Sequence, residues 1–240
     1  MEGKIRINKF LSASGYCSRR EADRLLEKKR VTIDGRIAEL GDRVSEGQNI
    51  CVDGNRVQEQ REQIVIAFHK PVGVVCTSSK KDKNNIVDFI HFGHRIYPVG
   101  RLDKDSTGLI LLTNDGELTD RILRGKNGHE KEYIVTVNKP LKKEILAAMA
   151  QGVPILDTVT RPCKIDQVDE RTFKIILTQG LNRQIRRMCE YFGYRVVTLK
   201  RERIMNIRLG SLEEGKWRYL TDHELQLLEE SLKGQKFYNE

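Results

Sequence analysis

Residues 100–116 read GRLDKDSTGLILLTNDG, and this stretch is the most informative part of the chain. It places one carboxylate, Asp103, in a tight turn two residues after a cation, Arg101. The apolar run over 109–113 predicts a buried strand, which the turn Asn114-Asp115-Gly116 closes. Because acidic residues are common in turns, the turn by itself explains Asp103. A catalytic role for Asp103 has to be supported by the residues around it.

The composition predicts a soluble globular protein with a polyanionic partner. The chain has 240 residues, 38% of them hydrophobic and 32% charged, and its 43 basic and 34 acidic residues give a formal net charge of +9. The pI is about 9.3. A basic excess of this size favours RNA or DNA as the ligand. The alternative is a basic protein with no such partner.

Several classes of protein are not indicated. No apolar run approaches the roughly 18 residues of a membrane helix, and the first ten residues, MEGKIRINKF, contain no signal-peptide core. The five cysteines are widely spaced and form no C-x-x-C motif, so neither a zinc site nor a disulfide framework is indicated. We therefore expect a cytoplasmic protein that contacts no membrane and holds no metal ion or cofactor.

A change in apolar content and in secondary-structure signals along the chain predicts two domains. Residues 5–57 carry short helix and strand signals around a modest number of apolar positions. Residues 58–63 have no apolar side chain, which is typical of a linker. Residues 64–240 carry longer strand signals with occasional helices, so they predict a second, larger domain.

Local signals in both domains predict the secondary structure. Ser18 with Glu21, and Thr221 with Glu224, have the capping-box spacing that begins a helix. The predicted helices cover 6–13, 19–29, 86–92, 117–123, 141–150, 183–192 and a C-terminal segment. The predicted strands cover 31–33, 64–68, 74–77, 109–113, 132–137, 172–178 and 196–199, and residues 49–57 predict a hairpin. Because strands and helices do not alternate regularly, we expect an α+β fold with a mixed or antiparallel sheet in the larger domain.

Tyr133 is a second candidate for a functional site. The alternation in residues 131–137 places Tyr133 on one face of a strand with Val135 and Val137. The ring is therefore expected to be at least half buried. A core tyrosine with a satisfied hydroxyl group would give the same pattern.

The helix predicted over 183–192 supplies candidate cations. Its apolar stripe consists of Ile185, Met188, Cys189 and Phe192. At about 100° per residue, Arg186 lies closest of the three arginines to this stripe, and a partly buried arginine needs a carboxylate or phosphate partner. Arg183 and Arg187 point further away and suit phosphate contacts or a solvated basic face.

A competing interpretation comes from residues 103–107. They match the D-x-D-x-T signature of haloacid-dehalogenase-type phosphatases, in which the first aspartate is a nucleophile and Mg²⁺ neutralises the phosphate. That chemistry places the motif directly after a buried strand, and residues 98–102 make a poor central strand. An activity that is indifferent to EDTA would speak against this interpretation.

The motifs together resemble one enzyme family. Residues 100–116 are similar to the catalytic signature of the RsuA/RluB/RluE/RluF family of RNA pseudouridine synthases. Residues 131–133 and 184–188 resemble its tyrosine and arginine motifs. Residues 8–11 and 17–22 resemble an S4 RNA-binding domain, so the small N-terminal domain is expected to be S4-like. Three more stretches, 85–89, 152–156 and 180–184, most resemble the branch that modifies large-subunit (23S) rRNA.

The resemblance implies the isomerisation of uridine to pseudouridine in RNA, above all in 23S rRNA, and leaves tRNA open as a second substrate. It assigns to Asp103 the carboxylate that attacks C1′ as a nucleophile or takes the C2′ proton as a base. Arg186 would keep Asp103 ionised in a buried pocket, and Tyr133 would lie against the uracil. No cofactor is implied.

A base inside structured RNA has to be flipped out before it can react. Arg101 would fill the vacated space or hold a phosphate, and Ile185 and Leu199 would line the pocket. Further RNA contacts are expected from basic residues of both domains, namely Lys9, Arg19, Arg20, Arg24, Arg183 and Arg187.

The alternative to an enzyme is a non-catalytic rRNA-binding or ribosome-assembly protein of the same fold. Charge and the first domain support both hypotheses equally. The trio Asp103, Tyr133 and Arg186 favours the enzyme, because binding alone requires no buried carboxylate. No heptad pattern is present, so we expect a monomer.

Overall fold

The computed structural model describes residues 4–58, 62–79, 81–123 and 128–233, and these form two units. The smaller unit takes its described residues from Met1–Ile64, Phe92–Ile96 and Asn114–Gly116. The larger unit takes them from Val65–His91, Tyr97–Thr113 and Glu117–Glu240. Each unit has its own apolar core. Residues 59–61 of the predicted linker lie outside the described part of the chain.

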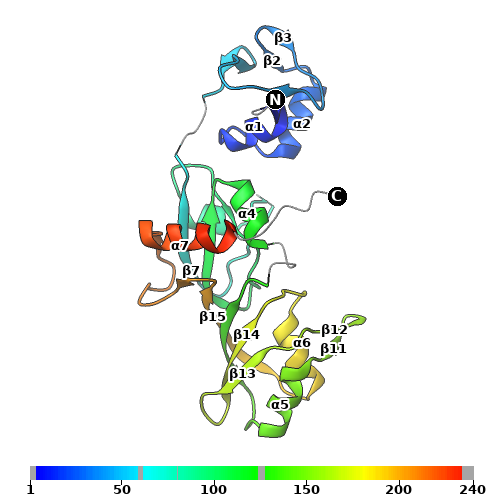
Figure 1. Ribbon diagram of the computed structural model, residues 1–240, viewed down its shortest axis with the longest axis vertical. Helices are drawn as coiled ribbons and strands as arrows, with labels where there is room; N and C mark the ends of the chain where they lie inside the picture. Colours follow the sequence, from blue (N-terminus) through cyan, green and yellow to red (C-terminus); the bar gives the residue numbers. More distant parts are fainter. Residues whose placement is uncertain (1–3, 59–61, 80, 124–127, 234–240) are drawn as a thin grey trace. The chain divides into compact units, whose positions relative to one another are not determined.

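The smaller unit packs two short helices against short strands (Figure 1). The helices are α1 (Ile7–Ala13) and α2 (Arg19–Glu27). The strands are β1 (Ile5–Arg6), β2 (Val31–Ile33), β3 (Arg36–Ile37), β4 (Arg43–Val44), β5 (Ile50–Val52) and β6 (Asn55–Arg56). β1 pairs with β4, and the others form a sheet in the order β3-β2-β5-β6. Every buried side chain of residues 4–57 is apolar.

Local chemistry explains where the elements of the smaller unit begin and turn. The Ser18 side chain accepts a hydrogen bond from the backbone N–H of Glu21 (3.1 Å), so the predicted N-cap of α2 is confirmed. The hairpins β2–β3 and β5–β6 turn at Asp34-Gly35 and Asp53-Gly54, where all four residues have positive φ. This is the type I′ geometry that matches the twist of paired strands.

The larger unit is built on a mixed sheet, as the α+β expectation requires. Within the described residues this sheet has nine strands. They are β7 (Val65–Lys70), β8 (Tyr97–Pro98), β9 (Thr107–Thr113), β10 (Lys131–Val137), β13 (Lys164–Gln167), β14 (Thr172–Leu177), β15 (Val196–Ile204), β16 (Ile207–Arg208) and β17 (Trp217–Tyr219). The main order is β13-β14-β10-β15-β9-β7-β17; β16 pairs with β15, and β8 pairs with β9. β15 and β9 run parallel, and the other pairs are antiparallel.

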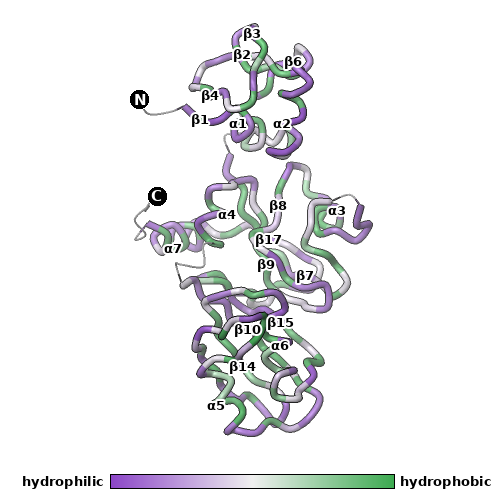
Figure 2. The backbone as a smooth tube through the Cα atoms, turned by 90° about the vertical axis from the view of Figure 1, so that its right-hand side faces the viewer, coloured by the Kyte–Doolittle hydropathy of each residue, from purple (hydrophilic) through white to green (hydrophobic). Residues whose placement is uncertain are grey.

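Helices cover the sheet and a separate hairpin flanks it. The helices are α3 (Ile86–Ile90), α4 (Gly116–Leu123), α5 (Lys143–Gln151), α6 (Gln184–Tyr191) and α7 (Asp222–Lys233), and the hairpin joins β11 (Pro154–Ile155) to β12 (Thr158–Val159). Side chains of α4 and α7 share a core cluster with one face of β7 and β9. On the other face, the rings of Phe68 and Phe89 lie 5.9 Å apart. Because both faces of the sheet are covered here, β9 is almost continuously apolar (Figure 2). In the same figure, helix α2 of the smaller unit is largely hydrophilic.

The predicted helix ends of the larger unit are close to the observed ones. Thr221 and Glu224 form a complete capping box at α7: the Thr221 hydroxyl accepts from the Glu224 N–H (3.2 Å), and the Glu224 carboxylate accepts from the Thr221 N–H (2.9 Å). The helix predicted over 86–92 ends at Ile90, because His91 takes a left-handed conformation. The helix predicted over 141–150 begins only at Lys143.

One strand prediction was wrong, and another was confirmed but ended too early. Residues 74–77 form a loop with a single bridge between Val75 and Asn85, because the Val74 carbonyl accepts from a buried lysine, Lys70, instead of a neighbouring strand. The strand predicted over 196–199 continues to Ile204 through four charged residues. Two of these, Lys200 and Arg203, pair with acidic side chains, which makes a charged strand tolerable.

No helix within the described residues combines the length and the apolar character that crossing a membrane requires.

Candidate active site

Asp103 lies in the loop between β8 and β9. The Ser106 N–H donates to the Asp103 carbonyl (3.0 Å), which closes the tight turn expected from the sequence. The Asp103 side chain is 34% exposed, so it is accessible from solvent but partly enclosed. The strand directly before the loop, β8, has only two residues. The buried strand that the phosphatase interpretation requires before this motif is therefore absent from residues 97–102, all of which are described.

The backbone of this loop is held by the last residue of β7, Lys70, and by residues that follow β7. The Leu102 N–H donates to Cys76 Sγ (3.4 Å), and the Gly73 N–H donates to the Lys104 carbonyl (2.8 Å). Lys70 is fully buried, and its Nζ donates to the carbonyls of Pro71 (2.8 Å), Val74 (2.8 Å) and Lys104 (3.5 Å). Burial lowers the pKa of Lys70. Our sequence reasoning missed this lysine; a lysine at the end of an apolar strand is the signal that could have revealed it.

Tyr133 projects from the middle of β10 and is 9% exposed. Val135 and Val137, on the same face, are 0% and 1% exposed, so the predicted face of this strand is confirmed. Lys131, two residues before Tyr133, lines a cavity together with Tyr133 and Asp103. Burial, and then the nearby charge of Arg201, lowers the pKa of Lys131.

The arginines around α6 are arranged differently from the expectation. Arg183, the N-cap residue of α6, has a left-handed backbone (φ 50°), and its Nη1 lies 3.8 Å from Asp103 Oδ2 and 3.4 Å from Asp105 Oδ2. Arg186 donates from Nη2 to the Asp105 carbonyl (2.8 Å) and the Ser106 hydroxyl (3.2 Å). The ion pair with Asp103 in this structure is therefore made by Arg183, and Arg186 binds the backbone of the same loop. Helical periodicity could not show this, because Arg183 is not a helical residue.

Arg201 is a residue of this site that sequence reasoning missed. It is 3% exposed, on a strand that was expected to end two residues earlier. Its Nε donates to the Leu109 carbonyl (2.6 Å) and its Nη1 to the Arg101 carbonyl (3.4 Å). Its guanidinium carbon lies 6.0 Å from the centre of the Tyr133 ring.

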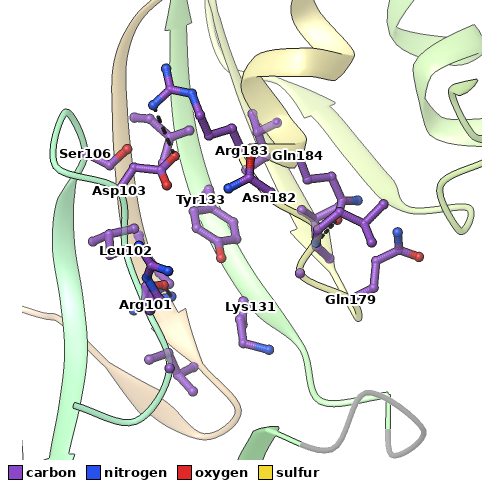
Figure 3. Close-up of a pocket in the computed structure, with 18 of the residues that line it drawn as sticks. Arg101, Leu102, Asp103, Ser106, Lys131, Tyr133, Gln179, Asn182, Arg183 and Gln184 are labelled. Atoms are coloured by element: carbon purple, nitrogen blue, oxygen red, sulfur yellow. Dashed lines mark hydrogen bonds and ion pairs between the residues drawn. The ribbon is translucent and has the colours of Figure 1, made fainter. Parts of the chain in front are cut away.

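These side chains line one cavity of about 450 Å³, a size suited to a small organic ligand. Of the residues predicted from sequence, the cavity brings together Arg101, Asp103, Tyr133, Arg183, Ile185, Arg186 and Leu199. Figure 3 shows Asp103 and Arg101 on one loop and Asn182 to Gln184 on the facing segment, with Tyr133 and Lys131 on the strand between them. Arg187 does not line the cavity and donates to the Asn182 carbonyl (3.1 Å).

The cavity carries a large excess of positive charge. Among its described lining residues, Asp103 is the only carboxylate, against four arginines and one lysine: Arg101, Lys131, Arg183, Arg186 and Arg201. A cavity of this charge attracts an anionic ligand. Thiol nucleophiles are not supported, because burial raises the pKa of Cys76 and raises that of Cys189 to about 12. The described residues contain no cluster of three or more histidine, cysteine or acidic side chains that could hold a metal ion.

The basic residues predicted in the smaller unit lie on its surface. Arg19, Arg20 and Arg24 are exposed on α2, and Arg24 pairs with Glu21 (3.0 Å). Arg19 and Arg20 have no such partner among the described residues. Lys9 is partly exposed on α1.

Comparisons with known proteins place the chain among proteins of one family. A family model described as RNA pseudouridylate synthase matches residues 64–191, and an S4 domain model matches residues 5–50. The chain is 51% identical over 226 residues to the dual-specificity RNA pseudouridine synthase RluF of Escherichia coli (strain K12), covering 93% of this chain and 78% of that protein. It is 34% identical to the ribosomal large subunit pseudouridine synthase B of Bacillus subtilis (strain 168), covering 93% and 95%. A crystal structure of a pseudouridylate synthase matches 93% of this chain and 99% of its own, with a TM-score of 0.69 and 30% identity.

Proposed function

The chain belongs to the RNA pseudouridine synthase family, and we propose that it isomerises uridines in large-subunit (23S) rRNA and, as a second substrate, in tRNA. The resemblance seen in residues 100–116 and in the S4-like segment is confirmed. The relative at 51% identity is named a dual-specificity enzyme, which supports two classes of RNA substrate. We further propose domain limits at 5–57 and 64–240, a monomer, and a cytoplasmic location.

The reaction breaks the C1′–N1 bond of uridine, turns the uracil, and forms a C1′–C5 bond, so that the C5 proton leaves and N1 becomes protonated. Asp103 supplies the carboxylate for this chemistry, as a nucleophile toward C1′ or as a base toward C2′. The single observation that carries this role is that Asp103 is the only carboxylate among the described lining residues of a strongly basic cavity.

The cations around Asp103 have separate tasks. Arg183 places its positive charge within ion-pair distance of the carboxylate (3.8 Å). Arg186 acts at the catalytic site by fixing the loop, because it binds the carbonyl of Asp105 and the hydroxyl of Ser106.

The remaining cavity residues receive the flipped nucleotide. The Tyr133 ring lies against the uracil, and the buried side chains of Ile185 and Leu199 form an apolar wall beside it. Arg101, exposed at the edge of the cavity, occupies the vacated place in the RNA stack or holds a phosphate.

Phosphate contacts outside the cavity add affinity. In the larger unit they come from Arg187, beside Asn182. In the smaller unit they come from Lys9, Arg19, Arg20 and Arg24, with little reading of base identity.

The test is the release of tritium from C5-labelled uridine in 23S rRNA and in tRNA. The wild type is expected to release tritium from both, without a metal requirement, and Asp103→Asn is expected to bind RNA normally but release none. Asp105→Asn is the matched control: it removes a carboxylate from the same loop, but one that is 62% exposed and outside the cavity lining. Failure of the wild type to release tritium from either RNA, free or in ribosomal particles, would overturn the proposal.

A further inference from the structure

Arg201 joins the two parts of the site that have to act together. In the sheet, β15 lies between β10, which carries Tyr133, and β9, which follows the Asp103 loop. Arg201 is the residue of β15 that pairs with Tyr133 on one side and with Gly108 on the other. A register shift next to Tyr133 produces this alignment: Glu132 pairs with Arg203, and Tyr133 pairs with Arg201. Such bulges commonly re-aim a side chain next to a functional site.

The side chain of Arg201 also contacts both the segment that carries Asp103 and the ring of Tyr133. Its Nη1 donates to the carbonyl of Arg101, two residues before Asp103, and its Nε donates to the carbonyl of Leu109, on the other side of the loop. The same guanidinium lies within 6.0 Å of the centre of the Tyr133 ring, inside the range of a cation–π contact. One planar group therefore sets the spacing between the Tyr133 ring and both ends of the segment that carries Asp103.

The buried positive charge of Arg201 is not expected to stabilise the fold. A buried guanidinium is costly unless a carboxylate neutralises it, and no described carboxylate lies within ion-pair distance of Arg201. Its Nη2 is buried and has no hydrogen-bond partner among the described residues. Arg203, two residues further along β15, is the structural counterpart: its side chain is 11% exposed and pairs with Glu130 (2.9 Å) and Glu132 (3.2 Å).

We propose that Arg201 is a positioning residue for the isomerisation, which holds the Tyr133 ring and the Asp103 loop in one reactive geometry. The inference rests on the proposed function. Arg201 acts through Tyr133 and the loop, so its loss should reduce the rate of the chemical step and leave RNA affinity unchanged. A displacement of about 1 Å between reacting groups can lower a rate by roughly 100-fold.

The experiment measures single-turnover tritium release, RNA dissociation constant and melting temperature for Arg201→Met, Arg201→Lys and the control Arg203→Met. We expect Arg201→Met to lower the single-turnover rate by about 100-fold with an unchanged dissociation constant. Arg203→Met should lose at least as much thermal stability and keep a rate close to the wild type. Arg201→Lys keeps the charge and part of the hydrogen bonding, so its rate should lie between those of the wild type and Arg201→Met. If Arg201→Met does not fold, the comparison is made between Arg201→Lys and Arg203→Met.

A double variant separates positioning from a general loss of structure. Because Arg201 acts in part through Tyr133, the rate loss of Arg201→Met combined with Tyr133→Leu should be smaller than the product of the two single losses, and a loss equal to that product would overturn the inference. Rates that fall in proportion to melting temperature in both the Arg201 and the Arg203 variants would overturn the inference and leave the proposed function standing. Absence of tritium release from the wild type would overturn both.

Discussion

The two units of this protein use positive charge in opposite ways. In the smaller unit, Arg19 and Arg20 are exposed, and every buried side chain of residues 4–57 is apolar. In the larger unit, Lys70 and Arg201 are 0% and 3% exposed, and both are held by backbone carbonyls. An exposed cation acts through its charge, is screened by salt, and can be replaced by a neighbour. A buried cation fixes the positions of the groups it binds. Under the proposed function, the smaller unit therefore contributes RNA affinity through several exposed charges, while turnover depends on a few exact distances in the larger unit.

The largest effect is expected where a backbone contact leaves no room for a side chain. A Cβ on Gly108 would lie 2.4 Å from the Arg201 carbonyl oxygen and 2.5 Å from its nitrogen, at a φ of +111°. Gly108→Ala has to push β9 away from β15, so we expect a loss of roughly 3–5 kcal/mol of unfolding free energy, measured with denaturant, together with most of the turnover.

Gly54→Ala is the matched control in the smaller unit. Gly54 also has a positive φ (+78°), but a Cβ there meets nothing within 4 Å. Only backbone strain remains, at about 1 kcal/mol. Equal costs for the two variants would show that the close contact between β9 and β15 does not constrain the site.

A smaller effect is expected from charge removal on α2. Replacing Arg19 and Arg20 by Gln should weaken RNA binding about tenfold at moderate salt and flatten the dependence of log K on log salt by roughly 0.7–0.9 per lost phosphate contact. Turnover at saturating RNA should not change. Binding titrations over a salt series test this, with Arg36→Gln/Arg56→Gln on the sheet of the same unit as a pair of equal charge. A reduced turnover with unchanged affinity would break the division between the two units.

The sequence predicted what local chemistry determines. The caps at Ser18 and Thr221 and the turn at Asp103 depend on neighbours within a few residues, and all three are present. The buried face of Tyr133 follows from a two-residue period, and it is also present.

Features that depend on distant partners could not be predicted. Residues 74–77 have a strand-like sequence, but a lysine from β7 takes the Val74 carbonyl. Arg201 lies in a charged run that reads as exposed, and only pairing with β9 and β10 makes it buried. Among the described residues, the cation that pairs with Asp103 is Arg183, whose left-handed backbone places it outside the helical period that pointed to Arg186.

The N-terminal caps of α2 and α7 are expected to contribute similar amounts to stability. Ser18→Ala removes the acceptor for the Glu21 N–H and should cost about 1 kcal/mol. Thr221→Ala removes the corresponding acceptor at α7 and should cost a similar amount. Hydrogen exchange of the first-turn amides in α2 and α7 measures both. Because caps are local, neither variant should alter tritium release, and a changed rate would show that the caps transmit strain to the cavity.

The smallest effect concerns acid stability. The hydrogen bonds from Arg218, above all, hold the pKa of Glu224 below its ordinary value of 4.5. A carboxyl group whose pKa is lower in the folded state stabilises the fold at neutral pH, and this contribution disappears as the pH falls through the folded pKa. Glu224→Gln keeps the capping geometry but removes the charge, so it should cost about 0.5 kcal/mol at pH 7 and progressively less below the ordinary glutamate value.

The Arg30–Asp53 ion pair of the smaller unit is the more exposed counterpart of Arg218–Glu224. The pKa of Asp53 is also lowered by an arginine, Arg30, but both side chains are largely exposed, at 40% and 47%. Salt should therefore weaken the Arg30–Asp53 pair more than the Arg218–Glu224 pair, whose side chains are 34% and 20% exposed. Melting curves of Asp53→Asn and Glu224→Gln at low and high salt test this. An equal salt response would mean that partial burial in the larger unit does not shield its ion pairs, and the contrast between exposed and buried charge would then hold for the cavity alone.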